Sequence, residues 1–375
     1  MLTAPPAPDV IELCREFVRI PSPSGQEGAL AAVVAAHMKF MGFSVELDRF
    51  GSVLGTRKGD HPGPALLFDS HLDVVPVGDP DGWTHPPFGA DLAEGRLWGR
   101  GAADTKCSLA AMLCAGAAAS DFAGTLHISA SVCEENMTAV ALAEVLDRHP
   151  ADLVIVGEPT GLCLGTAQKG RAGLLLEARG RSAHTSRPEL GDNAVYKMLE
   201  AIKRIRALPL PVDPELGPAI CELIEIDSEP KPSPGMVPHR CTARLALRLL
   251  PGETAQTVRE RTEACLQGLE GIEVKLLTST QRCHTGIEMV MEECVLSWKA
   301  QDSKLQARLL AALDTKAFAA PYSTNASAAA ARNIPAFLLG PGSIEQAHSV
   351  DEWVSLDELR AAQVAYAALI KEFLG

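Results

Sequence analysis

Six side chains that could bind or serve divalent metal ions are spread along the chain. They are two imidazoles and four carboxylates, namely His71, Asp104, Glu134, Glu135, Glu158 and His348. Zinc accepts imidazole nitrogen and carboxylate oxygen, and a catalytic zinc site keeps one position open for water. Two histidines, two terminal carboxylates, one bridging carboxylate and one spare carboxylate as base would build a two-metal hydrolase. The set therefore predicts hydrolysis at a pair of metal ions.

His71 and Asp73 follow an apolar run, residues 64–68, that is typical of a short buried strand. Polar residues at the carboxyl ends of parallel strands are where ligands collect. The two side chains are two positions apart, so in an extended chain they point the same way. A carboxylate beside a ligating imidazole fixes its tautomer and raises its basicity, which suits Asp73 better than direct ligation. The alternative is a surface loop with a chance His-x-Asp pair.

Asp104 precedes a run of small apolar residues, Ser108 to Ala119, that predicts a tightly packed helix. It is expected on the turn into that helix, where an aspartate often caps the first backbone N–H groups. A carboxylate held at a turn can also present both oxygens outward, the geometry that bridges two metals. This motif alone leaves both interpretations open.

Glu134 and Glu135 end a segment, residues 126–136, that is expected to be a strand. Neighbours in an extended chain project to opposite sides. One carboxylate could then bind metal while the other stays free to take a proton from water. An isolated acidic pair could equally be a solvated turn.

Glu158 and His348 each come after another apolar run. Glu158 stands where the run 153–156 breaks at Gly157, and His348 lies in the loop past the run 336–339. Four predicted strand ends and one helix start thus carry all six candidates. Chance explains that convergence less well than it explains any single motif.

Five segments that contain these residues resemble one enzyme family. They are HLDVVP from position 71, GRGAADTK from 99, EEN from 134, GEPT from 157 and GPGSIEQAHSVDE from 340. The chain is similar to the zinc-dependent aminoacylase and carboxypeptidase family, which includes acetylornithine deacetylase, succinyl-diaminopimelate desuccinylase and glutamate carboxypeptidase. The motifs occur in family order from about Ile11 to Glu358, so the resemblance spans nearly the whole chain.

The resemblance implies two Zn²⁺ ions, with Co²⁺ as a possible substitute, and a role for each candidate. Asp104 bridges the ions. The first site is completed by His71 and Glu158, and the second by Glu135 and His348. Glu134 is the general base, which accepts a proton from the attacking water and returns it to the leaving amine.

The same resemblance implies two residues for the substrate. His184 matches a histidine that reaches the substrate carbonyl, often from the partner subunit, and would stabilise the oxyanion. Arg248 resembles the arginine that pairs with a substrate carboxylate, a bidentate task that suits a planar guanidinium. The alternative for Arg248 is an ordinary charge on a surface strand.

The fold class expected is α/β. Up to about Ala167, apolar helices alternate with short buried strands, which predicts a mostly parallel sheet flanked by helices. From Lys169 to about His284, two strand–helix–strand passes predict an α+β sandwich with one sheet face free, a natural dimer surface. We therefore expect a catalytic domain of residues 1–168 and 285–375, with residues 169–284 as an inserted lid or dimerisation domain and a homodimer formed through the lid.

The amino-acid composition narrows the classes of partner that the protein is expected to bind. Lys and Arg number 34 against 47 Asp and Glu, a net charge of −13, which argues against nucleic acid because that partner needs a basic face. No uninterrupted apolar stretch is long enough to cross a bilayer, so no membrane partner is expected. The ten cysteines form no CxxC and most lie in apolar runs, as expected in a reducing compartment. Residues 1–8 lack the features of a signal peptide, and cytoplasmic location is the expectation.

The function expected is a di-zinc amidohydrolase that cleaves an N-acyl amino acid, similar to acetylornithine deacetylase. A dipeptidase or carboxypeptidase, or a desuccinylase of the succinyl-diaminopimelate type, would use the same site on a short peptide or another acyl group. A non-enzymatic binding protein should have lost a ligand or the base, and all six positions are filled. Two departures from the family pattern, Gly235 in the lid and Asn325 near the C-terminal part, put a polar substrate contact in question.

Overall fold

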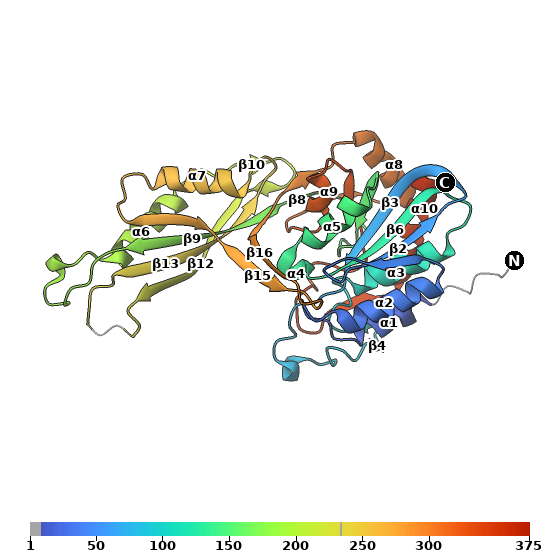
Figure 1. The fold of residues 1–375 in the computed structure, drawn as a ribbon, viewed down its shortest axis with the longest axis horizontal. Helices are drawn as coiled ribbons and strands as arrows, with labels where there is room; N and C mark the ends of the chain where they lie inside the picture. The colour runs from blue at the N-terminus through green and yellow to red at the C-terminus, as the bar shows by residue number, and fades with distance from the viewer. Residues whose placement is uncertain (1–8, 233–234) are drawn as a thin grey trace.

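The computed structural model describes residues 9–232 and 235–375. The expectation about a signal peptide falls on residues 1–8 and lies outside the described residues, as does Pro234 of the lid segment. Two units lie side by side, each with its own sheet, and the first and last described residues, Asp9 and Gly375, both belong to the larger unit (Figure 1).

The larger unit contains a nine-stranded sheet in the order β1-β2-β6-β3-β7-β20-β8-β18, with β19 paired to β8. Its strands are β1 (Ser44–Leu47), β2 (Val53–Lys58), β3 (His61–His71), β6 (Ala123–Ser131), β7 (Leu153–Val156), β8 (Leu164–Gln168), β18 (Trp298–Lys299), β19 (Ala317–Ala320) and β20 (Ala336–Leu338). The central strands β6, β3, β7 and β20 run parallel. The predicted mostly parallel sheet is confirmed.

Successive residues of the central strands point to opposite faces of this sheet. Because the residues on both faces are apolar, helices cover both faces. Leu66 and Phe68 of β3 pack in one hydrophobic cluster and Leu67 packs in another. The helices of the larger unit are α1 (Val10–Val18), α2 (Gly28–Phe40), α3 (Lys106–Ala118), α4 (Glu134–Met137), α5 (Val140–Arg148), α8 (Ser303–Leu313), α9 (Ala326–Ala330) and α10 (Leu356–Leu374). Helices α1, α3 and α10 contribute to the first cluster, and α5 and α9 to the second.

Smaller elements complete the larger unit. Strands β4 (Asp91–Ala93), β5 (Arg96–Trp98) and β21 (Trp353–Ser355) form a three-stranded antiparallel sheet. A 3₁₀ turn spans Pro80–Gly82. Because β21 lies directly after residue 352, this small sheet joins the segment before Asp104 to the segment after His348.

The smaller unit is an antiparallel sheet in the order β12-β13-β9-β14, with β17 also paired to β9. Its elements are β9 (Gly170–Arg179), a 3₁₀ turn (Pro188–Leu190), α6 (Ala194–Arg206), β12 (Ile220–Glu229), β13 (Arg240–Leu249), α7 (Ala255–Cys265), β14 (Ile272–Leu276) and β17 (Cys294–Val295). Residues alternate between buried and half-buried along β13, so α6 and α7 pack on one face only. The predicted α+β arrangement, with helices on one face of the sheet, is confirmed.

Two hairpins absent from the predicted elements lie between or beside these units. One is β10 (Val212–Asp213) with β11 (Gly217–Pro218), and the other is β15 (Thr278–Arg282) with β16 (Glu288–Glu292). Figure 1 shows the second hairpin extending from the smaller unit toward the larger one. No helix of the described residues is long and apolar enough to cross a membrane.

Candidate active site

The strands that precede most of the candidate residues are neighbours in one sheet. Strands β6, β3, β7 and β20 are adjacent and parallel, so their carboxyl ends meet at one edge. His71 is the last residue of β3, and Glu158 lies two residues past β7. The convergence expected from the sequence is therefore a property of the fold.

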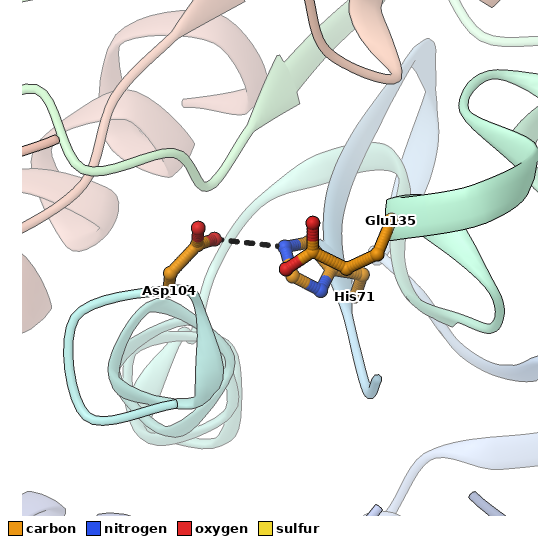
Figure 2. Close-up of side chains that lie close together, drawn as sticks. All are labelled: His71, Asp104 and Glu135. Atoms are coloured by element: carbon orange, nitrogen blue, oxygen red, sulfur yellow. Dashed lines mark hydrogen bonds and ion pairs between the residues drawn. The ribbon is translucent and has the colours of Figure 1, made fainter. Parts of the chain in front are cut away.

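Asp104 lies between the two histidines and contacts each with a different oxygen. Its Oδ1 is 3.0 Å from Nε2 of His71, and its Oδ2 is 3.4 Å from Nε2 of His348. Nε2 of His348 is also 3.1 Å from Oε1 of Glu135. Figure 2 shows the ion pair between His71 and Asp104, and the Glu135 side chain that extends from the start of α4 toward His71. The N-cap of α3 is Thr105, so Asp104 does not serve as the helix cap.

The spacing of these atoms fits metal ligands. Two ligand atoms about 2.0–2.1 Å from a tetrahedral ion stand about 3.3 Å apart, close to the separations that Asp104 and Glu135 make with the histidines. One ligand atom from each of His71, Asp104 and Glu135 lies within 4.8 Å of the others. Imidazole nitrogen with carboxylate oxygen is a donor set that zinc and similar divalent ions accept. The residues present fit a divalent metal centre.

Glu134 and Glu135 do not end a strand, so the extended-chain expectation was wrong. Strand β6 stops at Ser131, Cys133 takes a left-handed conformation with φ of 57°, and the two acids open the short helix α4. The carboxylate of Asp73 accepts the backbone N–H groups of Glu134 and Glu135 at 2.8 and 3.1 Å. A helix start leaves such N–H groups without backbone partners, and Asp73 supplies the acceptor.

Asp73 also fixes the His71 tautomer, but through its backbone. Nδ1 of His71 donates to the Asp73 carbonyl oxygen at 2.9 Å, whereas the nearest Asp73 carboxylate oxygen is 3.6 Å away. The Nε2 atom of His71 is thereby left to face Asp104. The supporting role expected of Asp73 is divided between its carbonyl and its carboxylate, which also accepts from Ser24 Oγ at 2.7 Å.

Two glutamates at the carboxyl edge of the parallel strands are buried and have few hydrogen-bond partners. Glu134 is 7% exposed and its Oε1 atom has no hydrogen-bond partner among the described residues. Glu158 is 5% exposed, and no hydrogen bond or ion pair joins its carboxyl to the described part of the chain. Buried polar atoms are nearly always satisfied in proteins, so these carboxyl groups require partners that the described residues do not provide.

The pKa shifts of the buried carboxyl groups also indicate that positive partners are needed at this edge of the sheet. Burial raises the pKa of Glu134 to about 8, and the carboxylates of Glu135 and Asp73 add to the increase. Burial also raises the pKa of Glu158 well above its usual range, together with the charges of Asp104 and Glu134. Burial opposes ionisation of Asp104 too, but hydrogen bonds from His348 and His71 outweigh it and lower that pKa. Crowded buried carboxylates of this kind are stabilised by bound cations.

Glu352 is a buried residue that supports the site and that the sequence did not identify. Its Oε1 atom accepts the backbone N–H groups of Gly101, Ala103 and Asp104 at 2.9–3.1 Å. Its Oε2 atom lies 2.7 Å from the Arg100 guanidinium. Glu352 therefore holds the turn that presents Asp104. Its only signal in the sequence is its position, four residues after His348.

A cavity of about 530 Å³ lies between Glu135 and the sheet of the smaller unit. Glu135 and Asn136 line it from the larger unit, and Arg171, Arg244 and Arg248 line it from strands β9 and β13. Arg248 faces Arg171 across the β13–β9 pair. Thus Arg248 and a candidate metal ligand lie in the same cavity.

His184 is not near the metal-ligand cluster of its own chain. It belongs to the segment between β9 and α6, and Figure 1 shows that segment at the end of the smaller unit remote from the larger one. Its Nδ1 atom contacts Ser186 Oγ at 2.8 Å, and its backbone pairs with Met236. The two departures from the family pattern also differ in location. The Gly235 carbonyl accepts the Thr185 N–H at 3.0 Å in this remote region, whereas Asn325 is buried and donates to Asp69 Oδ2 at 2.9 Å.

Comparison with known proteins identifies relatives over the full length. The chain is 29% identical to a succinyl-diaminopimelate desuccinylase of Phenylobacterium zucineum over 97% of this chain and 98% of that protein. It is 33% identical to the corresponding protein of Rhodospirillum centenum over 73% of this chain and 76% of the relative. An M20 family metallo-carboxypeptidase of Sulfolobus solfataricus has a similar fold, with a TM-score of 0.76 at 19% identity, covering 98% and 99% of the two chains.

A second solved structure has the same fold at lower identity. It is a dinuclear metal-binding peptidase of the M20 family from Bacillus subtilis, with a TM-score of 0.70 at 14% identity, covering 96% of this chain and 97% of that one. The family model described as peptidase family M20/M25/M40 matches residues 67–372, a range that includes the six candidate residues. The chain therefore belongs to peptidase family M20/M25/M40 and is a metal-dependent amide hydrolase.

Proposed function

We propose that the protein hydrolyses the amide bond of N-acyl amino acids at two zinc ions, with cobalt as a possible substitute. The observation that carries this proposal is the cavity in which Glu135 and Arg248 both lie. A substrate that spans the cavity would have its amide at the metal-ligand cluster and its carboxylate at the lid guanidinium. The succinyl-diaminopimelate desuccinylase names of the relatives support an acylated amino acid as substrate.

The arginines of the cavity differ in how far they are neutralised. Arg244 lies 3.6 Å from Glu225 and 3.8 Å from Glu293. Arg248 has no hydrogen bond or ion pair to any described residue. Burial lowers the pKa of Arg248, and the nearby positive charge of Arg171 lowers it further. Two facing guanidinium groups of which one is unpaired favour an anionic substrate.

Each residue of the cluster has a role in this mechanism. Two bound divalent ions would supply Lewis acidity, which lowers the pKa of a water and polarises the scissile carbonyl. His71, Asp104 and Glu158 would hold one ion, and Asp104, Glu135 and His348 the other. Glu134 takes the proton of the attacking water and returns it to the leaving amine. Its Oε1 atom is buried and has no hydrogen-bond partner among the described residues, which leaves that oxygen available to accept the proton.

A second candidate is an N-succinyl amino acid, whose acyl group carries another carboxylate. Arg171 favours it, because its guanidinium lines the same cavity opposite Arg248 and could pair with that carboxylate. A dipeptidase or carboxypeptidase would use the same metals and Arg248 but would have no acyl carboxylate to bind. A panel of N-acetyl, N-succinyl, N-formyl and dipeptide substrates separates these candidates. Hydrolysis confined to dipeptides would exclude the deacylase proposal.

Replacing Arg248, which is proposed to bind the substrate carboxylate, should remove the preference for substrates that carry a free α-carboxylate. For wild-type protein, converting the substrate α-carboxylate to a primary amide is expected to lower kcat/KM tenfold to a thousandfold, since a charge-assisted hydrogen bond of roughly 1.5–3 kcal/mol is lost. Arg248→Ala should erase most of that difference. The measurement compares acid and amide substrates on both proteins. An equal preference for the acid in wild type and variant would assign the carboxylate to another residue.

The protein is proposed to act as a homodimer, with residues 1–168 and 285–375 as the catalytic domain and 169–284 as the lid and dimerisation domain, to whose strand β9 the short strand β17 of the second catalytic segment is paired. The remote position of His184 supports this, because within one chain it reaches none of the ligands. Edge strand β12 exposes Ile220, Ile224 and Ile226 and could pair with a second copy. Mixing the impaired variants His184→Ala and Glu134→Gln should then raise activity above that of either variant alone through mixed dimers. Failure to complement after subunit exchange would contradict action across subunits.

Cytoplasmic location is also proposed, on the basis of the cysteines. Many of the ten thiols are buried in apolar surroundings, among them Cys107 and Cys114, where they act as small hydrophobic residues. Retention of activity in a reducing buffer would agree with this location, and loss of activity there would contradict it.

A further inference from the structure

A buried carboxylate joins the β15–β16 hairpin to the segment that carries the proposed base. Glu27 is fully buried at the start of α2. Its Oε1 atom accepts the backbone N–H of Cys133 at 3.0 Å and the Cys133 thiol at 3.2 Å. Its Oε2 atom is 3.3 Å from Nδ1 of His284, which lies in the hairpin turn. One side chain thus contacts both the hairpin and the residue that precedes Glu134.

In the hydrogen bond between His284 and Glu27, the imidazole is the donor and the carboxylate is the acceptor. Burial raises the pKa of Glu27, but hydrogen bonds from His284 and from backbone N–H groups outweigh it and lower the pKa overall. Glu27 is therefore an ionised acceptor, and Nδ1 of His284 must carry the proton it donates. The Gly25 N–H, at 2.9 Å from Oε1, completes the partners of this carboxylate.

The His284 ring occupies a fitted position on the larger unit. A Cβ atom added at Gly51 would lie 2.1 Å from the ring, and one added at Gly28 would lie 3.2 Å from it. The two glycines thus provide the space in which the ring reaches Glu27. Next to it, Thr285 Oγ1 donates to the Arg49 carbonyl at 2.9 Å, a second anchor of the hairpin that does not involve Glu27.

The segment held by Glu27 determines where the two acids point. Cys133 adopts a left-handed conformation, which costs free energy for a residue with a side chain and persists only where neighbours impose it. The Cys133 backbone directs chain entry into α4, from which Glu134 stays buried and Glu135 reaches His348. The same short helix has two more contacts from the smaller unit and hairpin. Asn136 donates to Gln281 at 3.0 Å, and Arg171 donates to Thr138 at 2.9 Å.

We propose that His284 and Glu27 are positioning residues, which couple the docked β15–β16 hairpin to the geometry of Glu134 and Glu135. The proposal rests on the proposed function, because it assigns Glu134 as base and Glu135 as metal ligand. Neither His284 nor Glu27 lines the cavity proposed to bind the substrate. Loss of their contact should disturb turnover and the environment of the metal ion more than substrate binding.

The test uses two replacements of His284 with the same shape. Asn places an amide N–H near the position of Nδ1, whereas Leu has a similar size and no donor. With full-length protein loaded with metal, His284→Leu should lower kcat about tenfold or more and change KM less than about threefold, and His284→Asn should recover most of kcat. Thr285→Val is the matched control, since it removes the other hairpin anchor, and it should leave kcat near that of wild type.

A second readout does not depend on turnover. The visible absorption of the Co²⁺-loaded protein reports the ligand geometry, and the spectrum should change in His284→Leu but not in His284→Asn or Thr285→Val. The proposal is overturned if Leu and Asn behave alike, if Thr285→Val matches Leu, or if Leu raises only KM. Absence of hydrolysis by the wild-type protein would instead contradict the proposed function, and the cobalt spectra would still decide the coupling.

Discussion

Replacing Glu134 with Gln is expected to remove nearly all turnover while two metal ions stay bound. Gln keeps the size of the side chain but cannot accept a proton from water, and general-base catalysis is worth about 10²–10⁴ in rate. Glu134 is buried, makes no hydrogen bond through Oε1 to the part of the chain that the structure describes, and has a pKa raised to about 8 by burial. The measurement is kcat together with elemental analysis of the purified variant.

Two outcomes would contradict that assignment. If the variant retained more than about a tenth of wild-type kcat, less than roughly 1.4 kcal/mol of barrier would have been lost, and another group would be the base. If the variant lost metal, Glu134 would be a ligand instead. Glu135→Gln is the matched comparison one position along α4, and it should lower metal content because its Oε1 atom contacts His348 at 3.1 Å.

Replacing Asp104 with Ala is expected to reduce bound metal from about two ions toward less than one and to abolish activity. Its two oxygens face different histidines, so a single substitution removes a ligand from both ions at once. His184→Ala should instead keep the full metal content and lower kcat, since His184 lies away from the cluster. Full metal in the Asp104 variant, or lost metal in the His184 variant, would reverse the roles.

Much of the fold was predictable because its elements carry local signals. The side chains of Asn193, Thr254 and Asp302 accept backbone N–H groups at the starts of α6, α7 and α8, and residues of these types favour the first position of a helix. The apolar runs of β3 and β7 also predicted where His71 and Glu158 would lie. Polar residues after buried strands gave the edge of the sheet at which these candidates gather.

The rest depends on contacts that no local pattern records. The conformation of Cys133, which turns a predicted strand end into a helix start, is imposed by Glu27 and Asp73 from other parts of the chain. Glu352 supports Asp104 from 248 residues away. The β15–β16 hairpin has polar residues on both strands, so its pattern did not distinguish it from a linker. The location of His184 follows from the length of β9, which carries the chain away from the site.

The most direct test of the central claim is a metal titration of activity. Protein stripped with a chelator is titrated with Zn²⁺, and in parallel with Co²⁺, while amine release from N-acetyl and N-succinyl amino acids is measured. The account predicts no hydrolysis without metal and an increase that reaches its plateau at two equivalents per chain. Hydrolysis that persists in the stripped protein, or no hydrolysis of any acylated amino acid or dipeptide at two equivalents, would contradict it.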